Sequence, residues 1–245
     1  MSELKTSQQF HSLEAARDEL ARRQARNPRR AERVQRFFAE EAVLALVADH
    51  PQATRPAVQG ALAGKPPKDP GLQTAVANAY RAGQHLTAHT AAGRDIEETL
   101  LPALHRLLFD GVDALAGHYR TGPTKPLLLG PPPMDAAFIP RALYNTYQWV
   151  GTASFTEIHP VEQAVLLCAR LLEIQPFAAG NLKAVPLAAS LPLLRHGFPP
   201  VLFPRAEHPA FLQALGLAFM LSMQPLIDLY TQALQRLLEE AMRRT

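Results

Sequence analysis

The residues that could do chemistry in this chain gather in one short segment, Gln175 to Asn181, which reads QPFAAGN. An apolar run with helical spacing ends before this segment, and Gly180 with Asn181 opens the next such run. Backbone N–H groups at the start of a helix have no intrahelical acceptor, and they attract anions. The segment therefore predicts a loop that binds an anionic group, such as a phosphate, at Gly180 and Asn181.

The side chains of this loop offer little acid–base or metal chemistry. Gln175 carries an amide, which has no titratable proton near neutral pH and cannot act as a general base. Ala179 carries a methyl group, which cannot ligate Mg²⁺ because that ion takes oxygen ligands. Lys183 adds a positive charge but lacks the two-pronged geometry of an arginine. Phe177 is expected to be the apolar anchor that pins the loop to the core.

Helices must position this loop, because apolar residues recur with helical spacing almost throughout the chain. The one departure is the segment 125–140, where two short apolar runs around a proline-rich turn indicate an edge β-hairpin. We expect an all-α bundle with one small hairpin, divided into an N-terminal helical extension (1–70) and a main domain (71–245). The expected helices cover residues 8–26, 29–49, 55–63, 72–89, 95–109, 141–151, 160–174, 181–196, 209–223 and 225–243.

Two prolines interrupt the helix that follows the loop. Pro186 and Pro192 both lack the N–H that a helix interior requires, at a cost of ~3 kcal/mol for each in a regular helix. We therefore predict that the helix over 181–196 is kinked or locally unwound.

The order of these elements, together with the loop, resembles the Fic (Fido) family, whose pattern is H-x-F-x-[DE]-G-N-[GK]-R-x-x-R. The resemblance covers about residues 72–204. It includes the segment 117–120 (GHYR), similar to the family's G-x-Y-R, and the segment 195–200 (RHGFPP), similar to its R-x-G-[YF]-P-P. The resemblance implies a Fic-like helical bundle in which the 125–140 hairpin is a flap that docks a target peptide. It also implies transfer of AMP from ATP to a protein hydroxyl.

The resemblance gives each loop position a role that several residues of this chain cannot perform. Gln175 stands where the family has its general-base histidine, and Ala179 where it has the acid that holds Mg²⁺. Lys183 and Pro186 stand at the two arginines that hold phosphate oxygens. The chain is therefore expected to be a pseudoenzyme related to protein AMP-transferases, with weak nucleotide or phosphate binding. ATP with Mg²⁺ is the cofactor that the family implies, although the Mg²⁺ ligand is absent.

Many Fic proteins carry an inhibitory segment, S/T-x-x-x-E-[GN], whose glutamate pairs with the second motif arginine. The segment 55–60 (RPAVQG) is similar, with Gln59 at the acid position. Gln59 would face Pro186, which has no charge to pair with. A chain without a competent site needs no carboxylate latch, so this segment is interpreted as a degenerate inhibitory segment.

Two other functions stay open. A Fic-fold enzyme with altered nucleotidyl or phosphoryl transfer would need no base for a pre-ionised or strongly acidic acceptor. A non-enzymatic module would bind a protein at the 125–140 hairpin, or nucleic acid through Arg22–Arg36, where seven arginines stand against Glu32. A solvated helix face is the plainer interpretation of the arginine run. A homodimer also stays open.

Four histidines could be offered as bases or metal ligands. His159 is expected to begin the helix before the loop, and His196 lies roughly 20 Å of helix away from the loop. His85 and His89 have the i, i+4 spacing of a metal-binding pair. Because no third ligand is evident nearby, two solvated histidines are expected instead.

Composition narrows the class of protein. The formal net charge is +3 and hydrophobic residues make up 47%, as in an ordinary folded domain. The one cysteine, Cys168, lies in an apolar run, so no disulfide and no cysteine-based zinc site can form within one chain. The first residues have no apolar signal region, and no uncharged apolar stretch reaches the ~20 residues of a membrane span. We therefore expect a cytoplasmic protein that does not bind membranes.

Overall fold

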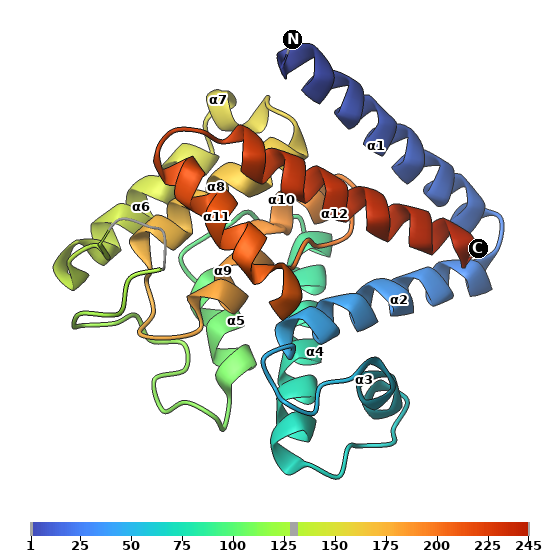
Figure 1. Cartoon of the computed structure of the whole chain (residues 1–245), viewed down its shortest axis with the longest axis horizontal. Coiled ribbons are helices and arrows are strands. Elements are labelled where there is room, and N and C mark those ends of the chain that lie inside the picture. The colour runs from blue at the N-terminus through green and yellow to red at the C-terminus, as the bar shows by residue number, and fades with distance from the viewer. Residues whose placement is uncertain (1, 128–131, 245) are drawn as a thin grey trace.

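The computed structural model describes residues 2–127 and 132–244, which fold into packed helices without a β-strand in that part of the chain (Figure 1). None of the described helices is both long and apolar enough to cross a bilayer. The α-helices are α1 (Ser2–Ala25), α2 (Pro28–Leu46), α3 (Arg55–Leu62), α4 (Pro70–Ala91), α5 (Leu100–Phe109), α6 (Ile139–Val150), α7 (Ala153–Thr156), α8 (Pro160–Ile174), α9 (Asn181–Ala189), α10 (Leu191–Arg195), α11 (His208–Phe219) and α12 (Gln224–Arg243). Two 3₁₀ turns, η1 (Ala136–Phe138) and η2 (Arg205–Glu207), precede α6 and α11.

Prolines and polar caps explain where many of these helices begin. Pro28, Pro70 and Pro160 stand in the first turns of α2, α4 and α8, where the missing N–H has no intrahelical acceptor to lose. Asn27 accepts hydrogen bonds from the first amides of α2, and Asp69 does the same for α4. A chain with 22 prolines can therefore be mostly helical.

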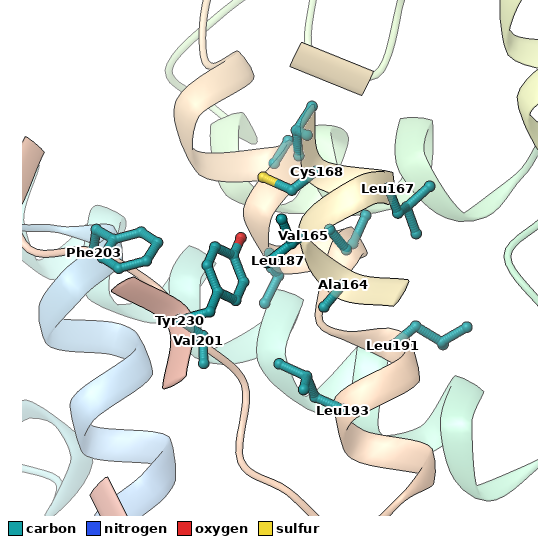
Figure 2. Packing of buried hydrophobic residues seen from close by; sticks show 14 of the residues in the cluster. Ala164, Val165, Leu167, Cys168, Leu187, Leu191, Leu193, Val201, Phe203 and Tyr230 are labelled. Carbon is teal, nitrogen blue, oxygen red and sulfur yellow. The ribbon is translucent and has the colours of Figure 1, made fainter. Parts of the chain in front are cut away.

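The core lies around α8, which α6, α9, α10, α11 and α12 surround. Figure 2 shows Cys168 of α8, Leu187 of α9 and Tyr230 of α12 in one packed cluster. The burial of Cys168 raises the pKa of its thiol to about 12, so the thiol stays protonated near neutral pH. The prediction of a buried thiol is confirmed.

Helices α1 and α2, predicted as part of an extension over residues 1–70, pack directly on the rest of the molecule. Figure 1 shows α1 alongside α12 and α2 lying across α4, and both contacts are extensive. Leu13 and Leu20 of α1 are buried, as are Val34 and Phe37 of α2. These side chains belong to the same hydrophobic core as α8. A domain boundary near residue 70 stays a prediction.

The predicted interruption after the loop is present, at Ser190. The expected helix over 181–196 is divided into α9 and α10, and α9 continues through Pro186. Ser190 donates its hydroxyl to the Pro186 carbonyl, and the Val201 N–H donates to that hydroxyl oxygen. Pro192 stands in the first turn of α10, where proline is tolerated. The chain therefore restarts a helix there instead of bending one.

The predicted hairpin over 125–140 is wrong for its second strand. Residues 136–140 form η1 and the first turn of α6, because the Asp135 side chain accepts a hydrogen bond from the Ala137 N–H and starts a turn. Residues 125–127 are not a strand, and residues 128–131 of the predicted first strand lie outside the described residues. The predicted helix from Asp95 also begins later, at Leu100, after a segment of turns.

Candidate functional site

The loop between α8 and α9 contains two left-handed residues, one at each end. Gln175 ends α8 with φ 48° and ψ 66°, and Gly180 precedes α9 with φ 75° and ψ 3°. A Cβ at Gly180 would lie 2.3 Å from the ring of Phe109 on α5. Glycine is therefore required at position 180 both by the backbone angle and by the space available.

Asn181 closes the loop with its side chain. The Phe177 N–H donates to Asn181 Oδ1 at 3.0 Å, and Asn181 Nδ2 donates to the Phe177 carbonyl at 2.8 Å. The Asn181 side chain is buried. It supports the loop from within, so a ligand could meet only the backbone N–H of Asn181.

Four successive backbone amides are available at the start of α9. The N–H groups from Ala179 to Leu182 have no hydrogen-bond acceptor among the described residues. Those of Lys183 and Ala184 donate to the Gly180 carbonyl at 3.0 Å. Unpaired donors at a helix start suit an anion. The anion contact at Gly180 and Asn181 stays a prediction.

Phe177 is the apolar anchor that the sequence predicts, and His105 of α5 is its partner. The two rings stack with centroids 3.8 Å apart, and Phe177 is fully buried. His105 Nε2 donates to the Ala179 carbonyl at 3.1 Å, while the Gly117 N–H donates to Nδ1 at 2.9 Å. Burial lowers the pKa of His105, so the ring is neutral. Both ring nitrogens are occupied, and His105 is therefore not free to act as a base.

Arg120 holds the loop from the other side. Its backbone N–H donates to the Pro176 carbonyl at 2.9 Å, and its Nε donates to the Gln175 carbonyl at 2.7 Å. The guanidinium is buried, and burial lowers its pKa. Its remaining N–H groups donate to the carbonyls of Gly122, Met134 and Ile174. Arg120 therefore ties the end of α8 to the segment that leads into α6.

Sequence reasoning did not assign these roles to His105 and Arg120. The available signals were a histidine on the apolar face of the predicted helix over 95–109 and the arginine of the segment 117–120. Neither signal identifies the loop as the partner, because His105 and Ala179 are 74 residues apart and Arg120 and Gln175 are 55 apart. Arg120 and His105 position the loop and supply no reactive group.

A carboxylate from outside the loop reaches Lys183. Its Nζ lies 2.6 Å from Asp49 Oδ1, in the turn between α2 and α3. The amide of Gln59 donates to Glu40 of α2 at 3.0 Å, and its place opposite Pro186 in a degenerate inhibitory segment stays a prediction. The acid that contacts the candidate site is therefore Asp49, which precedes the segment 55–60.

The described residues include no group of three or more histidine, cysteine, aspartate or glutamate side chains placed to hold a metal ion. His89 Nε2 donates to the Asp95 carbonyl at 2.8 Å. His89 is buried, which corrects the prediction that His85 and His89 are both solvated.

Part of this chain is similar in sequence to known proteins. The model of the Fic/DOC family matches residues 95–193, inside the predicted range of 72–204. "Protein adenylyltransferase fic-1" of Caenorhabditis elegans is 30% identical over 118 residues, which cover 46% of this chain and 23% of that protein. "Protein adenylyltransferase Fic" of Drosophila melanogaster is 25% identical over 163 residues, covering 64% and 32%. The chain thus corresponds to a quarter to a third of these relatives.

Solved structures agree on the fold. Fic-1 from Caenorhabditis elegans superposes with a TM-score of 0.84 at 19% identity, over 98% of this chain and 72% of that one. A Fic-domain signaling protein from Bacteroides thetaiotaomicron gives 0.82 at 18% identity, over 96% of both chains. The molecule has the all-α Fic fold. Residues 95–193 match the Fic/DOC family, and the chain is similar to protein adenylyltransferases over part of their length.

Proposed function

We propose that this chain is a Fic protein that binds the phosphates of a nucleotide weakly and does not transfer AMP. The observation that carries the proposal is a loop whose backbone is fully supported while its ligand-facing positions lack reactive groups. Gly180, Asn181 and Phe177 hold the loop shape, and the amides from Ala179 to Leu182 are available to an anion.

The side chains at the two chemical positions support the same proposal. Gln175 is 2% exposed and carries an amide where a general base would stand. Ala178 and Ala179 are the exposed residues of the loop, and neither offers an ionisable group. The nearby His105 has both nitrogens in hydrogen bonds to backbone atoms. A base would have to come from the substrate.

The residues present do not fit the Mg²⁺ that the family implies. Mg²⁺ requires oxygen ligands in near-octahedral geometry, and the methyl group of Ala179 supplies none. The carboxylate of Asp49, which contacts the motif, is paired with Lys183. We therefore expect nucleotide binding that does not depend on Mg²⁺.

Calorimetric titration with ATP, ADP and adenosine, each with and without Mg²⁺, tests the binding. ATP and ADP should bind with weak affinity, adenosine should not bind detectably, and Mg²⁺ should not tighten either complex. Adenosine binding as well as ATP would mean that the phosphates are not the group recognised. Tightening by Mg²⁺ would mean that a metal ligand has been overlooked.

Two variants locate the binding at Lys183. Lys183→Ala should weaken ATP binding, while Asp49→Ala should strengthen it by up to about fivefold, because an exposed ion pair is worth about 0–1 kcal/mol. Lys68→Ala removes an equal charge from the loop between α3 and α4 and serves as the matched control. Equal effects of Lys183→Ala and Lys68→Ala would place the nucleotide elsewhere.

Incubation with labelled ATP, Mg²⁺ and cell protein tests the absence of transfer. We expect no more label on any protein than in a control reaction that lacks this chain. Transfer that is lost in Gln175→Ala would favour the alternative of an enzyme with altered chemistry. Transfer that survives Gln175→Ala would show that the interpretation of position 175 as the base position is wrong.

A further inference from the structure

The positive charge of this protein is concentrated where α1 meets α2. Residues 22–36 contain seven arginines and one glutamate, a formal charge of 7 − 1 = +6. Since the whole chain has a net charge of +3, the remaining residues together carry 3 − 6 = −3. One fifteen-residue segment therefore determines the sign of the net charge.

Five of these arginines are exposed, and we call them together the arginine row: Arg22, Arg26, Arg29, Arg33 and Arg36. Arg29, Arg33 and Arg36 are all exposed, at the i, i+4, i+7 spacing of one helix face on α2. Arg22 and Arg26 are exposed at the end of α1. Figure 1 shows α1 and α2 meeting at an outer corner of the molecule, with the C-terminal end of α12 beside it. A large partner could therefore approach the row.

Internal ion pairing does not account for the row. Arg22 pairs with Glu19. In the part of the chain that the structure describes, Arg26, Arg29 and Arg36 make no ion pair, and Arg33 is bonded only to the Arg244 carbonyl, at 3.4 Å. Ion pairs among the described residues therefore do not explain the arginines of α2.

The start of α2 is an unfavourable place for cations. Arg29 and Arg30 stand in its first turn, which holds no acidic residue. The helix dipole puts partial positive charge there, so each arginine costs about 0.3–1 kcal/mol unless an anion neutralises it. Stability of the fold alone does not explain this placement, whereas an external anion would.

The chemistry of the row favours the phosphates of a nucleic-acid duplex. All seven cations of the segment are arginines, whose guanidinium forks match phosphate oxygens in pairs. The exposed large apolar residues of the described chain all lie outside 22–36, so the row has neither the apolar face that enters a membrane nor the aromatic side chains on which single-stranded bases stack. Arg29 to Arg36 extend roughly 10 Å along the helix, enough to follow a phosphate backbone.

We propose that the arginine row, Arg22, Arg26, Arg29, Arg33 and Arg36, is a binding surface for the backbone of double-stranded nucleic acid. The proposed contacts are to phosphates, which carry no sequence information, so binding should be independent of base sequence. This surface is separate from the loop at 175–181, so it does not depend on the function proposed for that loop.

Fluorescence anisotropy with a labelled 20-base-pair DNA duplex tests the proposal on the full chain. Binding at 50 mM KCl should weaken by about a hundredfold at 200 mM KCl, as expected when about four phosphates are contacted. Arg29→Gln/Arg33→Gln/Arg36→Gln should weaken binding at least tenfold at 50 mM KCl. The control, Arg81→Gln/Arg94→Gln/Arg141→Gln, removes the same charge from exposed positions on α4, the following turn and α6, and should change binding by less than twofold.

Each other outcome overturns the proposal. No duplex binding by the wild type at 50 mM KCl removes it outright. Equal losses in the two triple variants, with unchanged thermal melting of both, would mean that net charge acts without a defined surface. Tighter binding to a single strand of equal length, to an acidic peptide or to vesicles of anionic lipid than to the duplex would assign the row to that partner instead.

Discussion

Single residues outside the loop hold it in place, and Arg120 connects the most backbone to it. Arg120 donates to the Gln175 and Ile174 carbonyls at the end of α8 and to Gly122 and Met134 in the following segment. Because Arg120 is 6% exposed, its removal leaves the buried carbonyls of Gln175 and Ile174 without this donor. We expect Arg120→Met to lower the free energy of unfolding by about 3 kcal/mol, measured by urea denaturation.

The matched control for Arg120→Met is Arg141→Met. Arg141 is exposed on α6, so its replacement should change the free energy of unfolding by no more than about 0.5 kcal/mol. Equal effects at the two positions would show that the carbonyl contacts of Arg120 do not stabilise the fold. Arg120→Lys should be intermediate, since one ammonium group cannot reach all of these carbonyls.

The contact between Gly180 and Phe109 also holds the loop in place. A Cβ at position 180 would lie 2.3 Å from the Phe109 ring, and the φ of 75° is unfavourable for alanine. Gly180→Ala should therefore destabilise the protein by about 2 kcal/mol or more. In a Phe109→Ala background the closest clash disappears and only the contact with His105 Nε2 at 3.2 Å remains, so the cost of Gly180→Ala should be smaller. A double-mutant cycle measures this difference, and additive effects would contradict the contact.

At the scale of helices, the sequence predicts what depends on local pattern. Apolar spacing predicts the helices that hold the loop, near 160–174 and after 181, and prolines and glycines mark where they begin and end. The sequence also predicts that Phe177 is a buried anchor. The hairpin prediction fails because apolar runs with prolines do not distinguish an edge strand from a turn that Asp135 caps. The contacts of His105 with Ala179 and of Asp49 with Lys183 join residues that are far apart in the sequence, and such pairs leave no local sequence pattern.

The junction of α1 with α8 is an element whose stability should depend on pH. His159 caps α8 through Nδ1, which accepts from the Val161 N–H, and its ring stacks on Phe10 of α1 at 3.9 Å. Nε2 is buried without a hydrogen-bond partner among the described residues. Burial lowers the pKa of His159 to about 4, although Glu14, 3.9 Å away, opposes the shift.

A histidine with a lowered pKa in the folded state favours folding at high pH and opposes it at low pH. Its unfolded pKa is about 6.5, so the unfolded chain takes up the proton first as the pH falls. Stability should therefore be lost as the pH falls from 6.5 toward 4, by about 2 kcal/mol at pH 5. His159→Asn keeps a capping side chain and removes the titration, so urea denaturation should show a smaller loss from pH 7 to 5.

The control for His159 is His118→Asn. His118 is exposed in the segment after α5 and is not among the groups that shift the pKa of His159, so this variant shows what the loss of a histidine elsewhere does to the profile. Burial also lowers the pKa values of His85 and His105, which add pH dependence of the same sign to every variant. Only the difference between wild type and His159→Asn therefore measures His159. An identical profile in the two would show that His159 is not the group that titrates.

At the scale of the whole molecule, the question is whether residues 1–70 fold with the Fic-like part. Val34 of α2 is fully buried and Phe37 is 3% exposed, in the core that also contains α8. Because α2 contacts α4 and α12, and α1 contacts α12, unfolding either part exposes apolar surface of the other. We therefore expect one cooperative thermal transition, with equal calorimetric and van 't Hoff enthalpies.

A variant in α2 tests whether residues 1–70 unfold together with the rest of the chain. Val34→Ala should cost about 2 kcal/mol and lower the Tm of the single transition by about 4–8 °C, whereas Gln35→Ala on the exposed face of α2 should have little effect. If residues 1–70 formed an independent unit, Val34→Ala would shift only an early, small transition and leave the main one in place. Since the buried face of α2 meets helices from both parts of the chain, the shift should extend to the unfolding of α8 and the loop it holds.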